Sequence, residues 1–280
     1  MTHRHQALNR REFLKLLSAG AALAIGGGQF RVVADSDEEK AQRQPLGLIS
    51  VPPSLMLHSR HRWVLPDILA YLVAAGYEGI TYNDLALALT REIRLPEKPI
   101  LISIDDLSPV DGNPSHAYFA AMKDSLVEFG FKGTYAINTR PEDGPDERQW
   151  ADIASWVADG IALETHSAHH SNLDTPSFTR QDYAVEIIDS ARMIAARTGV
   201  PVQTLFTPYG SGYDRETKLV NPQVVTACQD AGIRFVVGIV DGREPLSTYT
   251  PAEDVLYVGR VGPGLTDDLA GAQYEIEHWS

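Results

Sequence analysis

The chain has 280 residues, of which 44% are hydrophobic and 22% are charged, the composition of an ordinary soluble globular protein. Its 24 basic and 37 acidic residues give a net charge of −13, so it lacks the basic footprint of a nucleic-acid-binding protein. The single cysteine, Cys228, excludes an internal disulfide, a zinc ribbon and a four-cysteine iron–sulfur site. We expect Cys228 to be a small buried hydrophobic residue.

The first 34 residues have the pattern of an export signal. Arg10 and Arg11 precede Phe13-Leu14-Lys15, a short apolar run follows, and Val32-Val33-Ala34 resembles a cleavage site. The paired arginines indicate export by the twin-arginine machinery. We therefore predict a signal peptide at 1–34, a flexible linker at 35–45 and one folded domain at 46–280. The predicted location is extracytoplasmic: periplasmic, cell-surface or secreted. The alternative is an uncleaved amphipathic anchor.

From Leu46 onward the chain repeats one pattern, in which an amphipathic helix is followed by a glycine and a short apolar strand. The predicted helices cover residues 65–75, 115–129, 149–159, 180–198 and 222–231. The predicted strands cover residues 55–58, 80–82, 100–104, 134–137, 161–163, 203–206, 235–237 and 255–258. Such alternation indicates βα units and a mainly parallel sheet. Eight strands suit a closed or nearly closed β/α barrel, and an open doubly wound sheet fits the periodicity as well.

The helices are predicted to bury one apolar face each. The expected buried residues are Ile68, Leu69, Leu72 and Val73 in the first helix, Tyr118, Phe119, Met122 and Leu126 in the second, and Ile153, Trp156 and Val157 in the third. No Gly-rich phosphate loop follows any strand, so the nucleotide-binding versions of an open sheet lack support.

Three polar clusters each follow a predicted strand. They are Asp105-Asp106, the histidines His166, His169 and His170, and the turn Thr207-Pro208-Tyr209-Gly210. Taken singly, each has an ordinary explanation: a cap or turn, a pair of surface histidines, and a plain turn. Together they lie at the carboxyl ends of the strands, which is the catalytic face of a β/α barrel.

The three clusters carry complementary chemistry. His166 and His170 are four residues apart, so on one helical turn they would face the same way and could grip one metal ion. His169 would then point to solvent or lie behind the ligands. Neighbouring strand residues face opposite ways, so one aspartate of the pair must lie where the strand turns. One aspartate with two histidines leaves positions open for water and substrate, and the other aspartate can accept a proton. The combination predicts a metal-dependent hydrolase.

The set of motifs resembles the polysaccharide deacetylases, the family 4 carbohydrate esterases. Their pattern is Asp-Asp, then His-Ser/Thr-x-x-His, then Arg-x-Pro-Tyr-Gly, matched here by Asp105-Asp106, by residues 166–170 and by residues 206–210. The stretches 55–59 and 76–99 are similar to the family's first strand and to its approach to the aspartate pair. The resemblance covers about residues 50–260 and is closest in style to the extracellular branch that includes poly-β-1,6-N-acetylglucosamine deacetylases.

The resemblance implies a fold, a site and a reaction. The fold is a distorted (β/α) barrel of about seven repeats with mainly parallel strands. Asp106, His166 and His170 would bind a divalent metal, most often zinc, with cobalt, nickel or iron(II) as alternatives. Asp105 would be the general base, and the backbone N–H of Tyr209 would stabilise the oxyanion. The substrate would be an N-acetylated or O-acetylated polysaccharide, and acetate would be released.

The sequence departs from the family pattern at three places. Leu107 replaces a glycine, Phe206 replaces the arginine that orients the base, and the late Leu-His-Asp motif that supplies the general acid is not evident. His278 is the only late histidine, and His58 is either near the metal or structural. Trp63 is a candidate sugar contact. The departures keep two alternatives open: a metal-free carbohydrate-binding protein on a degenerate scaffold, and a hydrolase of a small amide or imide.

Overall fold

A computed structural model describes residues 51–90, 92–108, 115–139, 147–239, 255–262 and 266–279. All of them belong to one unit of the chain, Pro45–Ser280. The predicted signal peptide and linker lie outside the described residues. No helix within the described ranges is long and apolar enough to cross a membrane.

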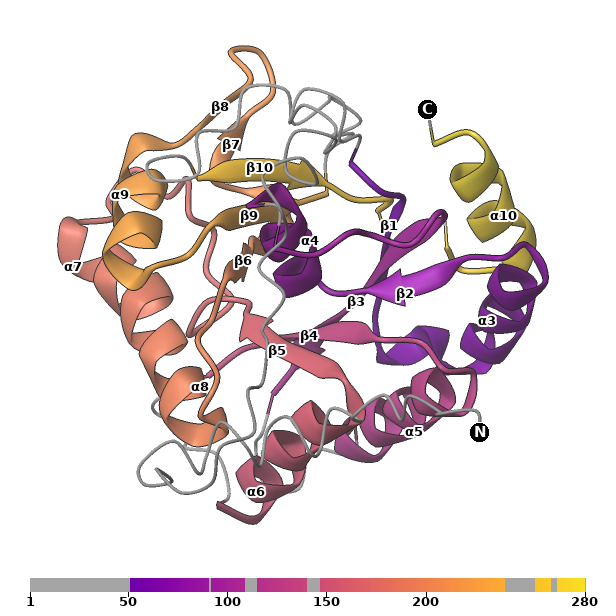
Figure 1. Ribbon diagram of the computed structural model, residues 1–280. Helices are drawn as coiled ribbons and strands as arrows, with labels where there is room; N and C mark the ends of the chain where they lie inside the picture. Colours follow the sequence, from indigo (N-terminus) through magenta and orange to yellow (C-terminus); the bar gives the residue numbers. More distant parts are fainter. Residues whose placement is uncertain are drawn as a thin grey trace, which may run out of the picture. The chain divides into compact units, whose positions relative to one another are not determined.

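Parallel strands form the central sheet, and its main path runs in the order β1, β3, β4, β5, β6, β9, β10 (Figure 1). Their bounds are Ser54–Leu57, Pro99–Leu107, Gly133–Ile137, Ile161–Thr165, Thr204–Phe206, Phe235–Gly238 and Leu256–Gly259. β2 (Glu78–Ile80) pairs with β3 outside this path, and β7 (Tyr213–Asp214) and β8 (Leu219–Val220) form a separate hairpin. A parallel bridge between Leu55 and Val261 links the two ends of the path. The sheet is therefore nearly closed, which confirms the predicted distorted (β/α) barrel.

The helices lie mostly outside this ring, with α3, α5, α6, α8 and α9 around the strands (Figure 1). The α-helices are α3 (Leu65–Ala74), α4 (Tyr82–Leu89), α5 (Ser115–Glu128), α6 (Glu147–Ser155), α7 (Arg180–Tyr183), α8 (Ser190–Thr198), α9 (Pro222–Ala231) and α10 (Leu269–Glu277). Shorter segments are the 3₁₀ turns η2 (Ser59–Trp63), η3 (Trp156–Asp159) and η5 (Pro208–Gly210) and the π-helical segment η4 (Ala184–Asp189). Gly160, Gly199 and Gly232 end their helices in the left-handed conformation.

Strand residues alternate between two cores. One side of each strand packs against the outer helices, and the other side faces the barrel interior. The interior core contains Leu101, Ala136, Phe206, Phe235, Val237 and Val258, joined by Tyr82, Leu85 and Leu89 of α4. Some interior-facing residues lie beyond this core, at the carboxyl ends of the strands. Polar side chains at these positions therefore lie close to one another.

The helix α4 corrects the predicted strand at residues 80–82, because only Ile80 belongs to β2. The Thr81 hydroxyl accepts a hydrogen bond from the Asp84 backbone N–H at 3.2 Å, and the Asp84 carboxylate accepts one from the Thr81 backbone N–H at 2.9 Å. This capping box starts a helix directly after the strand. Tyr82 is consequently a helix residue in the barrel interior.

Two residues predicted to be buried are exposed. Val73 is 52% exposed and Tyr118 is 39% exposed, whereas their predicted partners Leu72 and Phe119 are buried. Adjacent helix residues are separated by about 100° around the axis, so each of these two lies beyond the edge of the buried stripe. The buried faces of α3 and α5 are thus narrower than the sequence predicts.

Candidate metal and catalytic site

A bulge near the end of β3 separates the two aspartates. The pairing of β3 with β4 shifts register between Ile104 and Leu107, and Asp106 has a φ of +67°. A bulge re-aims one side chain of a strand. The Asp105 carboxylate therefore stays in the buried interior, while the Asp106 side chain is 46% exposed. Leu107, which takes the place of the family's glycine, continues the strand and is fully buried.

The histidines do not lie on a helical turn, so the geometric reason for grouping them was wrong. Residues 166–170 form a loop after β5, in which Ser167 has a φ of +66° and His170 a φ of +56°. The loop nevertheless brings the His166 and His170 rings together, with centroids 4.8 Å apart. It is anchored at its start, because the Asn138 side-chain amide donates to the His166 carbonyl oxygen at 2.6 Å.

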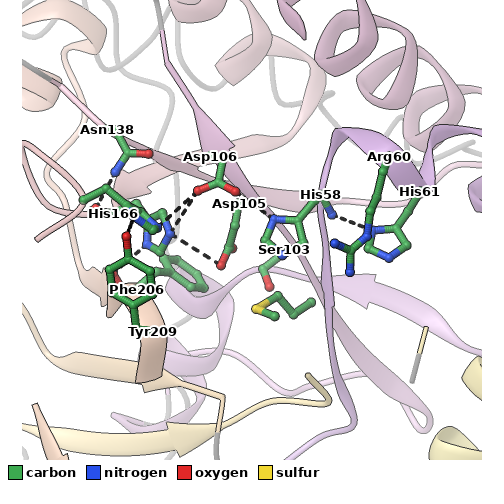
Figure 2. Close-up of polar contacts among 12 residues, drawn as sticks. His58, Arg60, His61, Ser103, Asp105, Asp106, Asn138, His166, Phe206 and Tyr209 are labelled. Atoms are coloured by element: carbon green, nitrogen blue, oxygen red, sulfur yellow. Dashed lines mark hydrogen bonds and ion pairs between the residues drawn. The ribbon is translucent and has the colours of Figure 1, made fainter. Parts of the chain in front are cut away.

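Asp106, His166 and His170 converge as metal ligands would (Figure 2 shows the first two). Asp106 Oδ1 lies 3.5 Å from His166 Nε2 and 3.4 Å from His170 Nε2. Tetrahedral zinc, with bonds of about 2.0–2.1 Å, separates its ligand atoms by roughly 3.3–3.4 Å. The two distances from the carboxylate match this spacing, and all three donor atoms lie within 4.8 Å of one another, so the donor set fits a divalent metal ion.

The second nitrogen of each imidazole has its own partner. His166 Nδ1 donates to the Phe206 carbonyl oxygen at 2.9 Å, which leaves the lone pair on Nε2. His170 Nδ1 lies 3.0 Å from the Tyr209 hydroxyl. Such partners fix the tautomer and the ring orientation of metal-binding histidines.

His58, at the end of β1, completes the surroundings of Asp106. Its Nδ1 lies 2.9 Å from Asp106 Oδ2, the carboxylate oxygen that faces away from the two histidines (Figure 2). Burial by itself raises the pKa of Asp106, but hydrogen bonds with His166 and His58 hold that pKa well below its usual range. The His58 backbone N–H donates to His61 Nδ1 at 2.7 Å, and His61 Nε2 pairs with Asp267 at 2.8 Å. These contacts tie the start of η2 to the site.

Asp105 is paired with Arg260, a residue that the sequence did not single out. Arg260 Nη1 donates to Asp105 Oδ1 at 2.7 Å, and Nη2 donates to Oδ2 at 2.8 Å. Burial raises the pKa of Asp105, but the guanidinium outweighs it and the pKa is lowered. Burial likewise lowers the pKa of His166, and the charges of Asp105 and Asp106 outweigh it, so this pKa is raised. The alternation of side chains along β10 could have indicated that Arg260 points inward, since Leu256 and Val258 share the interior face with it.

Tyr209 lies in the turn η5, directly after β6. Its φ of +59° departs from the helical value, and its side chain is 64% exposed beside His170. The turn thus places residue 209 next to the histidine pair. The role predicted for its backbone N–H stays a prediction.

Other residues singled out in the sequence lie elsewhere. His169 pairs with Glu186 at 2.9 Å, and His278 stacks on Tyr274 at the end of α10. Trp63, at the end of η2, is 78% exposed. The Arg62 guanidinium lies 4.6 Å from the centre of the Trp63 ring and 3.9 Å from that of Tyr118. Cys228 is buried in α9, as predicted.

The family model for polysaccharide deacetylases matches residues 92–236, more than half of the chain. The chain belongs to the polysaccharide deacetylase family. Membership confirms the resemblance seen in the motifs and makes the chain a hydrolase that removes acetyl groups from a polysaccharide. A search of curated proteins found no significant match.

Solved structures of deacetylases share the fold of this family member. Streptococcus pyogenes PplD, solved with acetate, is 13% identical with a TM-score of 0.62, over 83% of this chain and 99% of PplD. IcaB from Ammonifex degensii is 16% identical with a TM-score of 0.56, over 80% and 98% of the two chains. The BpsB deacetylase domain from Bordetella bronchiseptica is 15% identical with a TM-score of 0.55, over 75% and 94%.

Proposed function

We propose that this deacetylase is metal-dependent and hydrolyses the acetamido groups of an N-acetylated polysaccharide, releasing acetate. The observation that carries the proposal is the convergence of Asp106, His166 and His170 beside a buried, ionised Asp105. The base and one ligand come from β3 and the two histidines from the loop after β5, and they meet at one end of the barrel interior, where family 4 enzymes are expected to do their chemistry.

We propose zinc (Zn²⁺) as the ion, because two imidazoles and one carboxylate form a ligand set that zinc binds well. Cobalt, nickel and iron(II) take the same donors. When bound, the ion supplies Lewis-acid polarisation of the acetyl carbonyl and activation of water.

The chain's own groups have separate tasks in the proposed reaction. The Asp105 carboxylate accepts a proton from the attacking water, and the Tyr209 backbone N–H donates a hydrogen bond to the developing oxyanion. A C–O bond to the acetyl carbon forms, the C–N bond breaks, and the leaving nitrogen takes up a proton. Acetate and a free amine result.

His58 is the side chain that we assign to deliver that proton. The family's late histidine motif is missing from β10, but β1 adjoins the end of β10 through the Leu55–Val261 bridge. A histidine at the end of β1 therefore reaches the same edge of the site. An amine must be protonated before it leaves, whereas an ester oxygen leaves more readily, so a proton donor favours amide over ester hydrolysis.

A polymeric substrate located outside the cytoplasm is also part of the proposal. Trp63 is exposed at the end of η2, the segment that directly follows His58, and the apolar face of a sugar ring packs well on an aromatic ring. The twin-arginine pattern in residues 1–34 supports export to an extracytoplasmic polysaccharide.

The test is acetate release from N-acetylated and O-acetylated glycans by the full chain and by Asp105→Asn. We expect the wild type to release acetate from N-acetylglucosamine polymers. The variant should lose 10²–10⁴-fold in kcat, the usual contribution of a general base, while keeping its metal by elemental analysis. Acetate from O-acetylated glycans alone would redirect the proposal to an esterase. Neither turnover nor bound metal would favour the metal-free carbohydrate-binding alternative.

A further inference from the structure

Arg260 brings a charged group into the barrel interior. The residue is 2% exposed, and its contacts come from three other strands. On β3 it bonds Asp105 and also donates to Ser103 Oγ at 2.8 Å; on β9 it lies 3.4 Å from the Gly238 carbonyl oxygen. On β6, the centre of the Phe206 ring is 4.7 Å from the guanidinium carbon.

A buried ion pair of this kind is an expensive way to fill a core. Removing a guanidinium and a carboxylate from water is costly, and apolar residues of similar volume often stabilise a core as well or better. What the pair adds is orientation. The planar fork of arginine holds both oxygens of a carboxylate in one plane. Asp105 Oδ2 is thereby fixed 3.8 Å from His166 Nε2, facing the ligand cluster.

Phe206 stands at the position where the family pattern has an arginine, whose side chain orients the catalytic base. Its ring is fully buried, packs edge-on against Tyr82 at 5.3 Å and lies against the Arg260 guanidinium. β6 and β10 flank the same strand, β9, with Phe206 paired to Val237 and Gly259 paired to Gly238. Residues 206 and 260 therefore lie on either side of β9, and the Phe206 ring contacts the guanidinium that binds Asp105.

We infer that Arg260 is the positioning residue of the catalytic base, and that residues 206 and 260 have exchanged an apolar and a guanidinium side chain. The inference rests on the proposed role of Asp105. It also explains why phenylalanine can stand at position 206. The Arg260 side chain fills the space that an arginine at 206 would occupy, and the Phe206 ring packs against its guanidinium.

The experiment compares Arg260→Met, Arg260→Lys and the double variant Phe206→Arg/Arg260→Met in the full chain. Arg192→Met, which changes an exposed arginine on α8, is the matched control. For each variant, kcat and KM for acetate release, bound metal and thermal unfolding are measured. Wild type and Asp105→Asn are run beside them, so an inactive wild type would reveal failure of the proposed function rather than of this inference.

We expect Arg260→Met and Arg260→Lys to lower kcat about 10²-fold, the scale of a small misplacement of a reacting group, with KM and metal content unchanged. The double variant should regain at least tenfold in kcat over Arg260→Met, because the guanidinium returns from position 206. Arg260→Met with kcat close to wild type would overturn the inference. If Arg260→Met does not fold, the double variant decides: folding with activity supports the exchange, and folding without activity contradicts it.

Discussion

Backbone strain at single residues concentrates at the candidate site. Five described residues other than glycine have a positive φ, and four of them, Asp106, Ser167, His170 and Tyr209, lie in the cluster described above. Each such conformation costs on the order of 1–3 kcal/mol and persists only where the surroundings impose it. Here they accompany the approach of the Asp106 carboxylate to the His170 imidazole, whose Nε2 lies 3.4 Å from Asp106 Oδ1.

His58 offers a residue-level test of the proton path. We expect His58→Gln to lower kcat for an N-acetyl substrate by about 10²-fold or more, the scale of general acid catalysis. An aryl acetate should lose far less, since a phenolate leaves without a proton. Acetate release from both substrates is measured with the same enzyme preparation. Equal losses on the two would contradict a role in protonating the leaving group.

At this scale the sequence grouped Asp106, His166 and His170, and the structure brings these three side chains together for a different geometric reason. Spacing on a helical turn grouped His166 with His170, whereas a strained loop brings them together. Arg260 was missed because a lone arginine after a strand gives no sign of its partner, and Asp105 lies 155 positions earlier in the chain. Only the closure of the barrel reveals that pair.

At the level of elements, strand positions were predictable and helix details were not. The strands of the sheet's main path were predicted, because short apolar runs bounded by turns are distinctive, whereas the strand predicted at 80–82 shares only Ile80 with β2. The helix α4 was missed although its Thr81 and Asp84 have the spacing of a capping box. The helix predicted at 180–198 contains the π-helical segment η4, which the hydrophobic periodicity of the sequence does not predict. That segment carries Glu186, the residue that anchors the histidine loop.

Glu186 gives a pH-dependent prediction about this element. It accepts hydrogen bonds from the His169 backbone N–H at 2.9 Å and from Ser171 Oγ at 2.8 Å. Burial raises the pKa of Glu186, but these bonds and His169 outweigh it and lower the pKa below its ordinary value of 4.5. A lowered pKa means that the stabilisation is present above pH 4.5 and is lost as pH falls through the folded-state value.

We therefore expect Glu186→Gln to reduce the unfolding free energy by about 1–3 kcal/mol at pH 7, the worth of hydrogen bonds to a charged group. The difference from wild type should shrink as pH falls below 4.5. Denaturant unfolding at pH 7 and pH 3.5 measures it, with the exposed Glu147→Gln as control. A difference of the same size at both pH values would show that the charge of Glu186 is not what holds the loop.

For the whole molecule, near-closure of the sheet is what assembles the site. Asp105 and Asp106 come from β3, His166 and His170 follow β5, Tyr209 follows β6, Arg260 follows β10 and His58 follows β1. The carboxyl ends of these strands lie at one end of the barrel. Trp63 is the last residue of η2, which follows His58 at this same end. A 3₁₀ segment rises about 2.0 Å per residue, so Trp63 stands roughly 10 Å from His58 along the chain. We propose that it contacts a sugar other than the one being deacetylated.

Trp63→Ala is accordingly expected to raise KM for a polymeric substrate about 2–10-fold, the worth of one aromatic contact, with kcat unchanged. The N-acetylglucosamine monomer should show no change. Tyr274→Ala, which removes an exposed aromatic side chain on α10, is the matched control. Kinetics on monomer, short oligomer and polymer measure the effect. An equal change in KM for all three lengths would refute a contact with neighbouring sugars.

Metal reconstitution of the full chain tests the central proposal most directly. Acetate release is followed after chelation and then during stepwise addition of zinc, with bound zinc measured in the same samples. We predict that chelation abolishes activity and that it returns in proportion to bound zinc, up to one ion per chain, whereas His170→Ala neither binds the ion nor recovers. Full activity in the chelated, metal-free protein would contradict the proposed mechanism.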